Sequence, residues 1–173
     1  MVQYKRIFVI GHPGAGKALI AERVAKKLGW KFLDANLDLE SRIGLTLDEI
    51  AGKQGVEAFY HCESQILVYQ LSQEHIVVTT DGTIVLSEKN RQLLSSEFVV
   101  YLKVSTSVQL ERVPKNPEPL LPMNERKALF DKLHHERDSL YEQVANIVID
   151  SDDGAIEEHI LRIVKAVEKN NCC

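Results

Sequence analysis

A glycine-rich loop near the N-terminus constrains the fold of this chain more than any other feature. The segment Gly11-His-Pro-Gly-Ala-Gly-Lys17 follows a β-branched apolar run at residues 6–10 and precedes residues 19–28, which carry apolar side chains at helical spacing. A loop between a strand and a helix brings backbone N–H groups toward phosphate oxygens, and the lysine adds a full positive charge. A glycine-rich turn that binds nothing would explain the glycines but not this lysine. The segment therefore predicts a phosphate-binding loop in an α/β fold.

The loop departs from the complete phosphate-binding pattern at the residue after the lysine. The pattern places a Ser or Thr there, whose hydroxyl is a ligand of Mg²⁺, but this chain has Ala18 followed by Leu19. Because Mg²⁺ keeps several waters, a water can replace the hydroxyl, so we expect weaker metal positioning and an intact cradle. We expect nucleotide contacts from the loop and the first helical turn, which comprise Gly11, Gly14, Ala15, Gly16, Lys17, Ala18 and Leu19.

Four further apolar runs are short, continuous and separated by helical stretches. They lie at residues 32–33, 75–79, 98–102 and 147–149, and the most regular helical patterns lie at residues 19–28, 46–52, 57–72, 125–145 and 157–169. This alternation predicts a parallel sheet covered by helices on both faces. Residues 113–122 hold four of the five prolines, so we expect a loop there.

Composition limits the class of protein and its partners. A chain of 173 residues is typical of one domain, and its net charge of −4 provides no global positive field. We therefore expect neither nucleic acid nor a membrane as a partner. The apolar stretch at residues 7–10 is too short for a signal peptide or a membrane span, and three cysteines show no readable disulfide framework. A cytoplasmic protein fits these features best.

The histidines show no spacing typical of a metal site. His12 occupies a variable position in the loop, and we expect it to face solvent or to pack within the loop. His134-His135 and His61-Cys62 bring ligand types together, but no further Cys or His follows at a convincing chelating distance. We therefore expect these histidines on the surface.

With the loop in place, the chain resembles the shikimate kinase family from about Arg6 to the final helix. The matching segments are Phe32-Leu-Asp-Ala-Asn36, Gly44-Leu-Thr-Leu47, Gly55-Val-Glu-Ala-Phe59 leading to Glu63, Asn90-Arg91, Tyr101-Leu102, Pro119-Leu-Leu121 and His135-Glu-Arg-Asp-Ser-Leu-Tyr141. The resemblance implies a single three-layer P-loop kinase domain with a five-stranded parallel sheet. It also implies a helical substrate-binding region at about 36–74 and a lid at about 113–124. Such kinases use ATP with Mg²⁺ and phosphorylate a hydroxyl of a small cyclic acid.

The resemblance also implies roles for individual residues. Arg112 falls where the family has an arginine near the adenine, and Arg137 where it has one that binds the substrate carboxylate. In the family's Asp-x-Asp, the first acid holds Mg²⁺ waters and the second binds the reacting hydroxyls. These positions are Asp34 and Asn36 here, and an amide cannot accept a proton as a carboxylate does.

The substrate side departs further from the family. Tyr60 occupies the position at which the family has a second carboxylate-binding arginine. The tyrosine offers one hydroxyl where the arginine offers a charged bidentate fork. Gly82 is the only glycine kept from a triple glycine after the third strand. Glu118 occupies the position at which the family has a lid arginine, and Lys115 is the nearest basic residue in the lid. These changes predict weak binding of shikimate.

Asp81 has two interpretations. An acid at the end of a central parallel strand is where P-loop enzymes commonly hold the Mg²⁺ shell, and Thr79-Thr-Asp-Gly82 also resembles nucleoside monophosphate kinases. Alternatively, Asp81-Gly82 is a common turn signal. On the first interpretation, Lys17, Asp34 and Asp81 form the catalytic set, and both acids hold the metal through water.

The sequence leaves three functions open. The first is an ATP-dependent phosphotransferase for a small hydroxylated acceptor other than shikimate, bound by Asn36, Tyr60, Gly82 and Arg137. The second is a catalytically impaired nucleotide-binding protein that serves a partner protein. The third is slow residual shikimate kinase activity.

Overall fold

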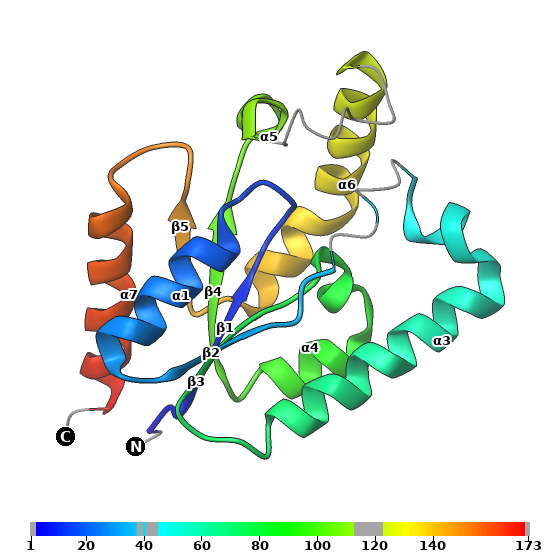
Figure 1. The fold of residues 1–173 in the computed structure, drawn as a ribbon. Coiled ribbons are helices and arrows are strands. Elements are labelled where there is room, and N and C mark those ends of the chain that lie inside the picture. Colours follow the sequence, from blue (N-terminus) through cyan, green and yellow to red (C-terminus); the bar gives the residue numbers. More distant parts are fainter. Residues whose placement is uncertain (1–2, 38–39, 41–44, 113–122, 172–173) are drawn as a thin grey trace.

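The structure is a computed structural model that describes residues 3–37, 40, 45–112 and 123–171. Five strands form one parallel sheet in the order β2-β3-β1-β4-β5 (Figure 1). The strands are β1 (Arg6–Ile10), β2 (Lys31–Asp34), β3 (Ile76–Thr79), β4 (Phe98–Lys103) and β5 (Ile147–Asp150). The helices are α1 (Lys17–Leu28), α3 (Leu47–Gln70), the 3₁₀ helix η1 (Gly82–Leu86), α4 (Glu88–Leu94), α5 (Thr106–Arg112), α6 (Met123–Val144) and α7 (Ile156–Asn171). The predicted parallel α/β sheet is confirmed.

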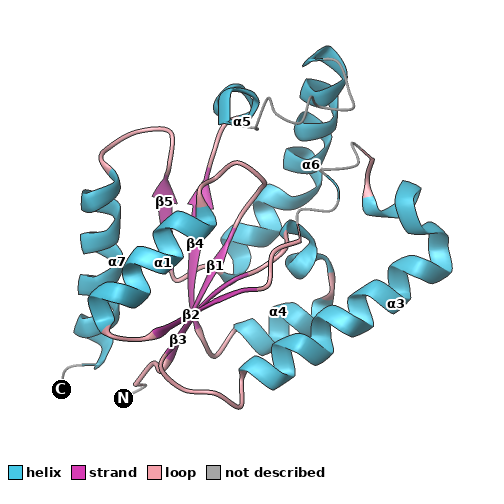
Figure 2. Cartoon of the chain, in the orientation of Figure 1, coloured by secondary structure: helices cyan, strands magenta, loops and turns pink. Residues whose placement is uncertain are grey.

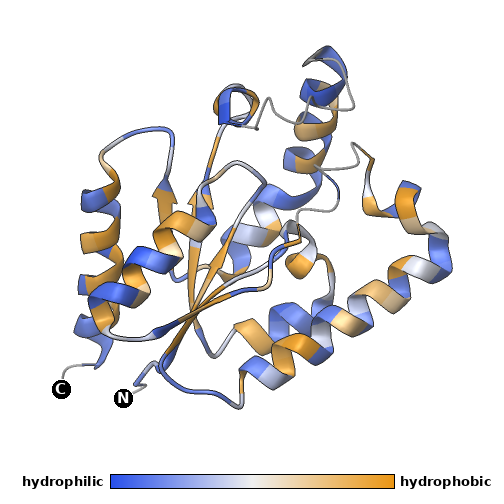
Figure 3. Cartoon of the chain, in the orientation of Figure 1, coloured by the Kyte–Doolittle hydropathy of each residue, from blue (hydrophilic) through white to orange (hydrophobic). Residues whose placement is uncertain are grey.

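Helices cover both faces of the sheet (Figure 2). Alternate residues of β1 point to opposite faces: Ile7 and Val9 pack in a core with α1 and α7, whereas Phe8 and Ile10 pack in a core with α3, α4 and α6. Because both faces are buried, the interior positions of a central strand are apolar. Figure 3 shows this continuous apolar character in the central strands.

Helix α3 combines the two helices that the sequence predicts at residues 46–52 and 57–72. They meet at a kink at Gly52, where φ is 66° and ψ is 175°. The first segment starts with a capping box, in which the Thr46 hydroxyl accepts from the Glu49 N–H and the Glu49 carboxylate accepts from the Thr46 N–H. Since only the glycine leaves helical geometry, the second segment begins earlier than predicted.

Three short elements have no bounds predicted from the sequence. They are η1, α4 and α5, and each has five or seven residues. Such segments are too short for a clear apolar periodicity. Helix α4 begins with the Ser87 hydroxyl accepting from the Asn90 N–H.

The carboxyl ends of the strands meet at one edge of the sheet, where open parallel sheets bind ligands. There β1 leads into the phosphate loop and β3 leads to Asp81. The predicted lid, with Lys115 and Glu118, lies largely outside the described residues. Among the described helices, none is both long enough and apolar enough to span a membrane.

Candidate active site

The glycines of the phosphate loop hold backbone conformations that side chains disfavour. Gly11 has a φ of 146°, and a Cβ there would lie 2.6 Å from the carbonyl oxygen of Leu102 in β4. Gly16 has a φ of 86° and N-caps α1, so the cap brings no side chain to the first N–H groups of that helix. These N–H groups and the helix dipole favour an anion. The loop therefore fits a phosphate group.

Lys17 is the first residue of α1 and is buried against the loop, with an exposed fraction of 4%. Its Nζ donates hydrogen bonds to the carbonyl oxygens of Gly11 at 2.7 Å and His12 at 2.9 Å. The ammonium group is thus held at the loop, and its contact with a nucleotide phosphate stays a prediction. Ala18 and Leu19 follow as exposed residues, and neither side chain offers an oxygen to a metal.

Arg112 ends α5 and bridges two loops at the rim of the site. Its Nη1 donates to the carbonyl oxygen of Gly14 at 3.2 Å, and its Nη2 donates to that of Ser151 at 2.6 Å. A second contact of Nη1, to the carbonyl oxygen of Ala15, is 3.5 Å long. The guanidinium therefore joins the phosphate loop to the segment after β5, beside the predicted nucleotide site.

Asp34 and Asp81 lie at the ends of the neighbouring strands β2 and β3. The Asp34 Oδ1 accepts from the Thr79 hydroxyl at 2.7 Å and from the Asn36 N–H at 3.0 Å. The Asp81 Oδ1 accepts from the Leu37 N–H at 2.5 Å. Asp34 is exposed whereas Asp81 is buried, and the Asp81-Gly82 pair opens the helical segment η1. Both carboxylates thus lie at the ligand-binding edge of the sheet, and both order the backbone after β2.

Arg137 of α6 forms a buried ion pair with Glu40. The Nη1 lies 2.7 Å from Glu40 Oε1, and the Nη2 donates to Oε2 at 2.9 Å. The exposed fractions are 1% for Arg137 and 6% for Glu40, whose Oε2 also accepts from the Leu47 N–H. Burial alone would lower the pKa of Arg137, but the hydrogen bond and charge of Glu40 raise it above its ordinary value. The sequence predicts that Arg137 binds an acceptor anion, and it does not predict Glu40 opposite.

Gly82 lies where α6 meets the end of β3. A Cβ at this position would lie 3.1 Å from the Tyr141 hydroxyl oxygen and 3.4 Å from Arg137 Nη1. The Tyr141 hydroxyl donates to the Gly82 carbonyl oxygen at 2.7 Å, and burial raises the pKa of Tyr141, which keeps this donor protonated. The structure thus brings Gly82 and Arg137 together, and their contact with an acceptor stays a prediction.

Tyr60 and Glu63 face the same region from α3. Burial, followed by the charge of Asp48, raises the pKa of Tyr60 to about 12, while the nearby charge of Arg137 opposes this shift. Burial raises the pKa of Glu63 to about 8, although a hydrogen bond from the Thr83 hydroxyl to its Oε2 opposes this rise. The Glu63 carboxyl therefore carries a proton near neutral pH. The sequence alone assigns no role to Glu63, because burial cannot be read from one glutamate.

A cavity of about 330 Å³ lies between α3 and the ends of β2 and β3. Of the predicted site residues, Asp81 lines it, together with Glu63 and the two neighbours of Asn36, which are Ala35 and Leu37. The remaining lining is Phe59, Cys62, Ile66, Leu67, Gln70, Thr80 and Ile84. The cavity is therefore mainly apolar, and Glu63 of α3 and Asp81 after β3 bring two carboxyl groups to its lining.

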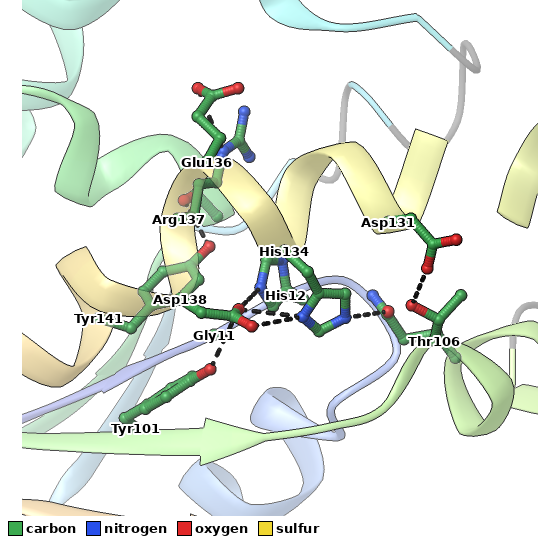
Figure 4. Close-up of polar contacts among 12 residues, drawn as sticks. Gly11, His12, Tyr101, Thr106, Asp131, His134, Glu136, Arg137, Asp138 and Tyr141 are labelled. Carbon is green, nitrogen blue, oxygen red and sulfur yellow. Dashed lines mark hydrogen bonds and ion pairs between the residues drawn. The ribbon is translucent and has the colours of Figure 1, made fainter. Parts of the chain in front are cut away.

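His12 packs within the loop, which is one of its two predicted environments, whereas His134 differs from its prediction. His12 is fully buried and its Nε2 lies 2.5 Å from Asp138 Oδ1, so it packs in the loop and does not face solvent (Figure 4). Burial lowers the pKa of His12 to about 4 despite this bond. His134 is not a solvated surface residue, because its ring lies 4.0 Å from that of His12 between centroids. The prediction is confirmed for His135 and His61, which are exposed.

Comparison with known proteins identifies the family. A sequence model of the shikimate kinase family matches residues 13–168. The chain belongs to the shikimate kinase family. Shikimate kinase of Francisella philomiragia is 33% identical over 166 residues, which cover 94% of each chain. Shikimate kinase of Methylococcus capsulatus is 33% identical over 168 residues, which cover 96% of this chain and 94% of the relative.

The fold comparison agrees. The structure of shikimate kinase from Acinetobacter baumannii in complex with shikimate has a TM-score of 0.79 and 29% identity, and the match covers 99% of this chain and 97% of that chain. The predicted P-loop kinase fold of the shikimate kinase family is thereby confirmed. Kinases of this family use ATP with Mg²⁺.

Proposed function

We propose that this chain is an ATP-dependent phosphotransferase whose acceptor is a small hydroxylated molecule other than shikimate. One observation carries the proposal: the phosphate loop with Lys17 lies at the same edge of the sheet as Asp34 and Asp81. Phosphoryl transfer depends on positioning and on charge stabilisation. A lysine and carboxylates around one edge provide both.

The nucleotide side uses the residues that fit a phosphate. Gly11, Gly14, Ala15 and Gly16 present the loop backbone to the phosphates, Lys17 supplies the positive charge, and Arg112 lies at the rim. Ala18 and Leu19 extend the first helical turn. Mg²⁺ neutralises phosphate charge when it is bound, and Asp34 and Asp81 would hold its waters, which offsets the missing hydroxyl at Ala18.

The acceptor side favours an uncharged molecule. Arg137 is already neutralised by Glu40, so an incoming carboxylate would meet a carboxylate beside its guanidinium. Tyr60 offers one hydroxyl where the family has a second arginine, and a lost charge-assisted hydrogen bond costs about 1.5–3 kcal/mol, or roughly 10- to 150-fold in affinity. Tyr60, Asn36 and the backbone of Gly82 suit hydroxyl groups. We therefore propose a neutral polyol as the acceptor class.

A second candidate function is nucleotide binding without catalysis, in the service of a partner protein. The observation that favours it is the coincidence of two losses at one site, the metal-binding hydroxyl at Ala18 and the second acid at Asn36. In either case we place the protein in the cytoplasm, since the exposed free thiol of Cys62 suits a reducing compartment.

Calorimetry with ATP and ADP, each with Mg²⁺ or with chelator, tests the nucleotide site. Lys17→Ala is expected to abolish binding. Lys27→Ala, which removes an exposed charge from the other end of α1, is the matched control and is expected to bind normally. If the wild type shows no heat with millimolar nucleotide, both candidate functions fail.

A transfer assay then separates the candidates. The wild type is supplied with Mg²⁺-ATP and with linear polyols, cyclic polyols or shikimate, and ADP release is followed. Turnover with a neutral polyol that exceeds turnover with shikimate supports the proposal. Turnover with shikimate at sub-millimolar concentration would instead establish a shikimate kinase. Nucleotide binding without transfer to any of them would favour the partner-binding candidate.

A further inference from the structure

Two histidines and one aspartate from distant parts of the chain form a cluster outside the acceptor region. His12 lies in the phosphate loop, whereas His134 and Asp138 lie one turn apart on α6 (Figure 4). His134 Nδ1 lies 2.9 and 3.0 Å from the two carboxylate oxygens of Asp138, and His12 Nε2 lies 2.5 Å from Oδ1. One donor atom from each residue lies within 4.8 Å of the others.

Gln109 determines which nitrogen of His134 carries a proton. The Gln109 Nε2 donates to the Pro13 carbonyl oxygen at 2.8 Å, so its Oε1, which lies 2.7 Å from His134 Nε2, must accept. Nε2 is therefore protonated, and a neutral His134 presents the lone pair of Nδ1 to the carboxylate of Asp138. Two acceptors in contact require a cation between them, either a second proton on the ring or a metal ion.

We propose that His12, His134 and Asp138 bind a divalent transition-metal ion of the zinc type. Two imidazoles and a carboxylate are ligands typical of Zn²⁺, whereas Mg²⁺ prefers oxygen alone, so this site is distinct from that of Mg²⁺-ATP. Bonds of ~2.0–2.1 Å in tetrahedral geometry place ligand atoms about 3.3 Å apart. The contacts of Asp138 with the two histidines would lengthen by about 0.4–0.8 Å to reach this spacing. Gln109 already provides the outer hydrogen bond that orients a ligating histidine.

A neighbouring cavity gives the ion access and room for water. It has a volume of about 210 Å³ and is lined by His134 and Asp138, with Asp150 and Asp152 among the other lining residues. The side chain of Asp138 is 38% exposed, so the cluster opens to solvent on this side. Three of the lining residues are acidic and one, Lys103, is basic, so the balance of charge favours a cation there, and a water from the cavity supplies the fourth ligand.

Metal titration of untagged, chelator-treated protein tests the site. The starting protein carries Cys62→Ser, Cys172→Ser and Cys173→Ser, because thiolates also bind zinc. Calorimetry with Zn²⁺ is expected to show one ion per chain. Co²⁺ as the probe is expected to give visible absorption bands typical of tetrahedral or five-coordinate geometry, and Zn²⁺ is expected to displace it.

Variants assign the ligands. His134→Ala and Asp138→Asn are each expected to weaken Zn²⁺ binding at least tenfold, and Gln109→Ala is expected to weaken it about 10- to 100-fold. His135→Ala removes an exposed histidine from the same helix and is expected to change nothing. Melting curves without metal confirm that each variant folds.

The absence of Zn²⁺ binding in the starting protein would overturn the proposal and leave a proton as the cation in the cluster. Binding that survives both His134→Ala and Asp138→Asn would also overturn it. Neither result bears on the proposed kinase activity, because these tests use no nucleotide.

Discussion

Arg137 and Glu40 are 97 residues apart in the sequence and form a bidentate ion pair, with N–O distances of 2.7 and 2.9 Å, in the interior of the protein. The pair joins α6 to the segment before α3. It also removes the net charge that Arg137 would otherwise present to an acceptor. The same contact therefore bears on stability and on the choice of acceptor.

Removal of the Glu40 charge is expected to destabilise the fold. Glu40→Gln leaves the Arg137 guanidinium buried without its counter-charge, and breaking a buried pair in this way costs roughly 3–5 kcal/mol in the free energy of unfolding. Urea denaturation measures this change. Glu136→Gln is the control, because Glu136 is exposed and lies 3.8 Å from Arg137 Nε; it is expected to cost less than about 1 kcal/mol. Equal costs for the two variants would contradict the importance of the buried pair.

Glu63 is expected to make stability depend on pH. Burial raises its pKa from 4.5 to about 8, so the folded protein binds more protons than the unfolded chain between these values. The stability contributed by this group is complete below pH 4.5 and is lost as the pH rises through 8. Relative to Glu63→Gln, the wild type is expected to lose roughly 2–5 kcal/mol of unfolding free energy between pH 4 and pH 9.

Denaturation series across this pH range measure the difference. Glu57→Gln changes an exposed acid on the same helix and is expected to follow the wild type. Parallel pH profiles for the wild type and Glu63→Gln would show that Glu63 has an ordinary pKa.

Shikimate affinity is expected to return when the two altered acceptor positions are restored. Tyr60→Arg adds a charged fork, and Asn36→Asp adds a proton-accepting carboxylate. We expect roughly a 10- to 150-fold gain in affinity from Tyr60→Arg, and a larger gain from the double variant than from either change alone. Calorimetry in the presence of ADP provides the affinities. Tyr69→Arg adds the same charge at an exposed position of α3 and is expected to have no effect; an equal gain from it would mean that general electrostatic attraction suffices.

Changes at Ala18 and Asp81 are expected to have opposite effects on nucleotide binding in the presence of Mg²⁺. Ala18→Ser restores a hydroxyl beside Lys17 and is expected to tighten binding of Mg²⁺-nucleotide severalfold, because the hydroxyl touches only the metal. Asp81→Asn keeps an oxygen that accepts from the Leu37 N–H but removes the negative charge. It is expected to weaken the binding of Mg²⁺-nucleotide. Titrations with ADP and chelator serve as the control. In them the wild type and both variants are expected to bind ADP with the same affinity. The same Mg²⁺ dependence in all three would show that neither position organises the metal.

Local sequence was sufficient to predict the phosphate loop and the sheet. Gly11 to Lys17 are contiguous, and their conformation follows from glycine flexibility at the start of a helix. The central strands β1, β3 and β4 were predicted because burial on both faces imposes continuous apolar runs. The edge strands β2 and β5 are partly exposed and have shorter apolar runs, which their alternation with helices made recognisable. The short elements η1, α4 and α5 lack such a signal, since five or seven residues do not establish a period.

The sequence by itself thus determined the fold class, the position of the nucleotide loop and the departures at Ala18, Asn36 and Tyr60. Only the tertiary structure decided that Arg137 is paired with Glu40, that Glu63 is buried, and that His12 meets Asp138, which lies 126 residues further along the chain. These relationships involve residues of α3, of α6, of the phosphate loop and of the segment before α3. Ion pairing and desolvation depend on residues that are distant along the chain. Local propensity and residue spacing therefore cannot predict them.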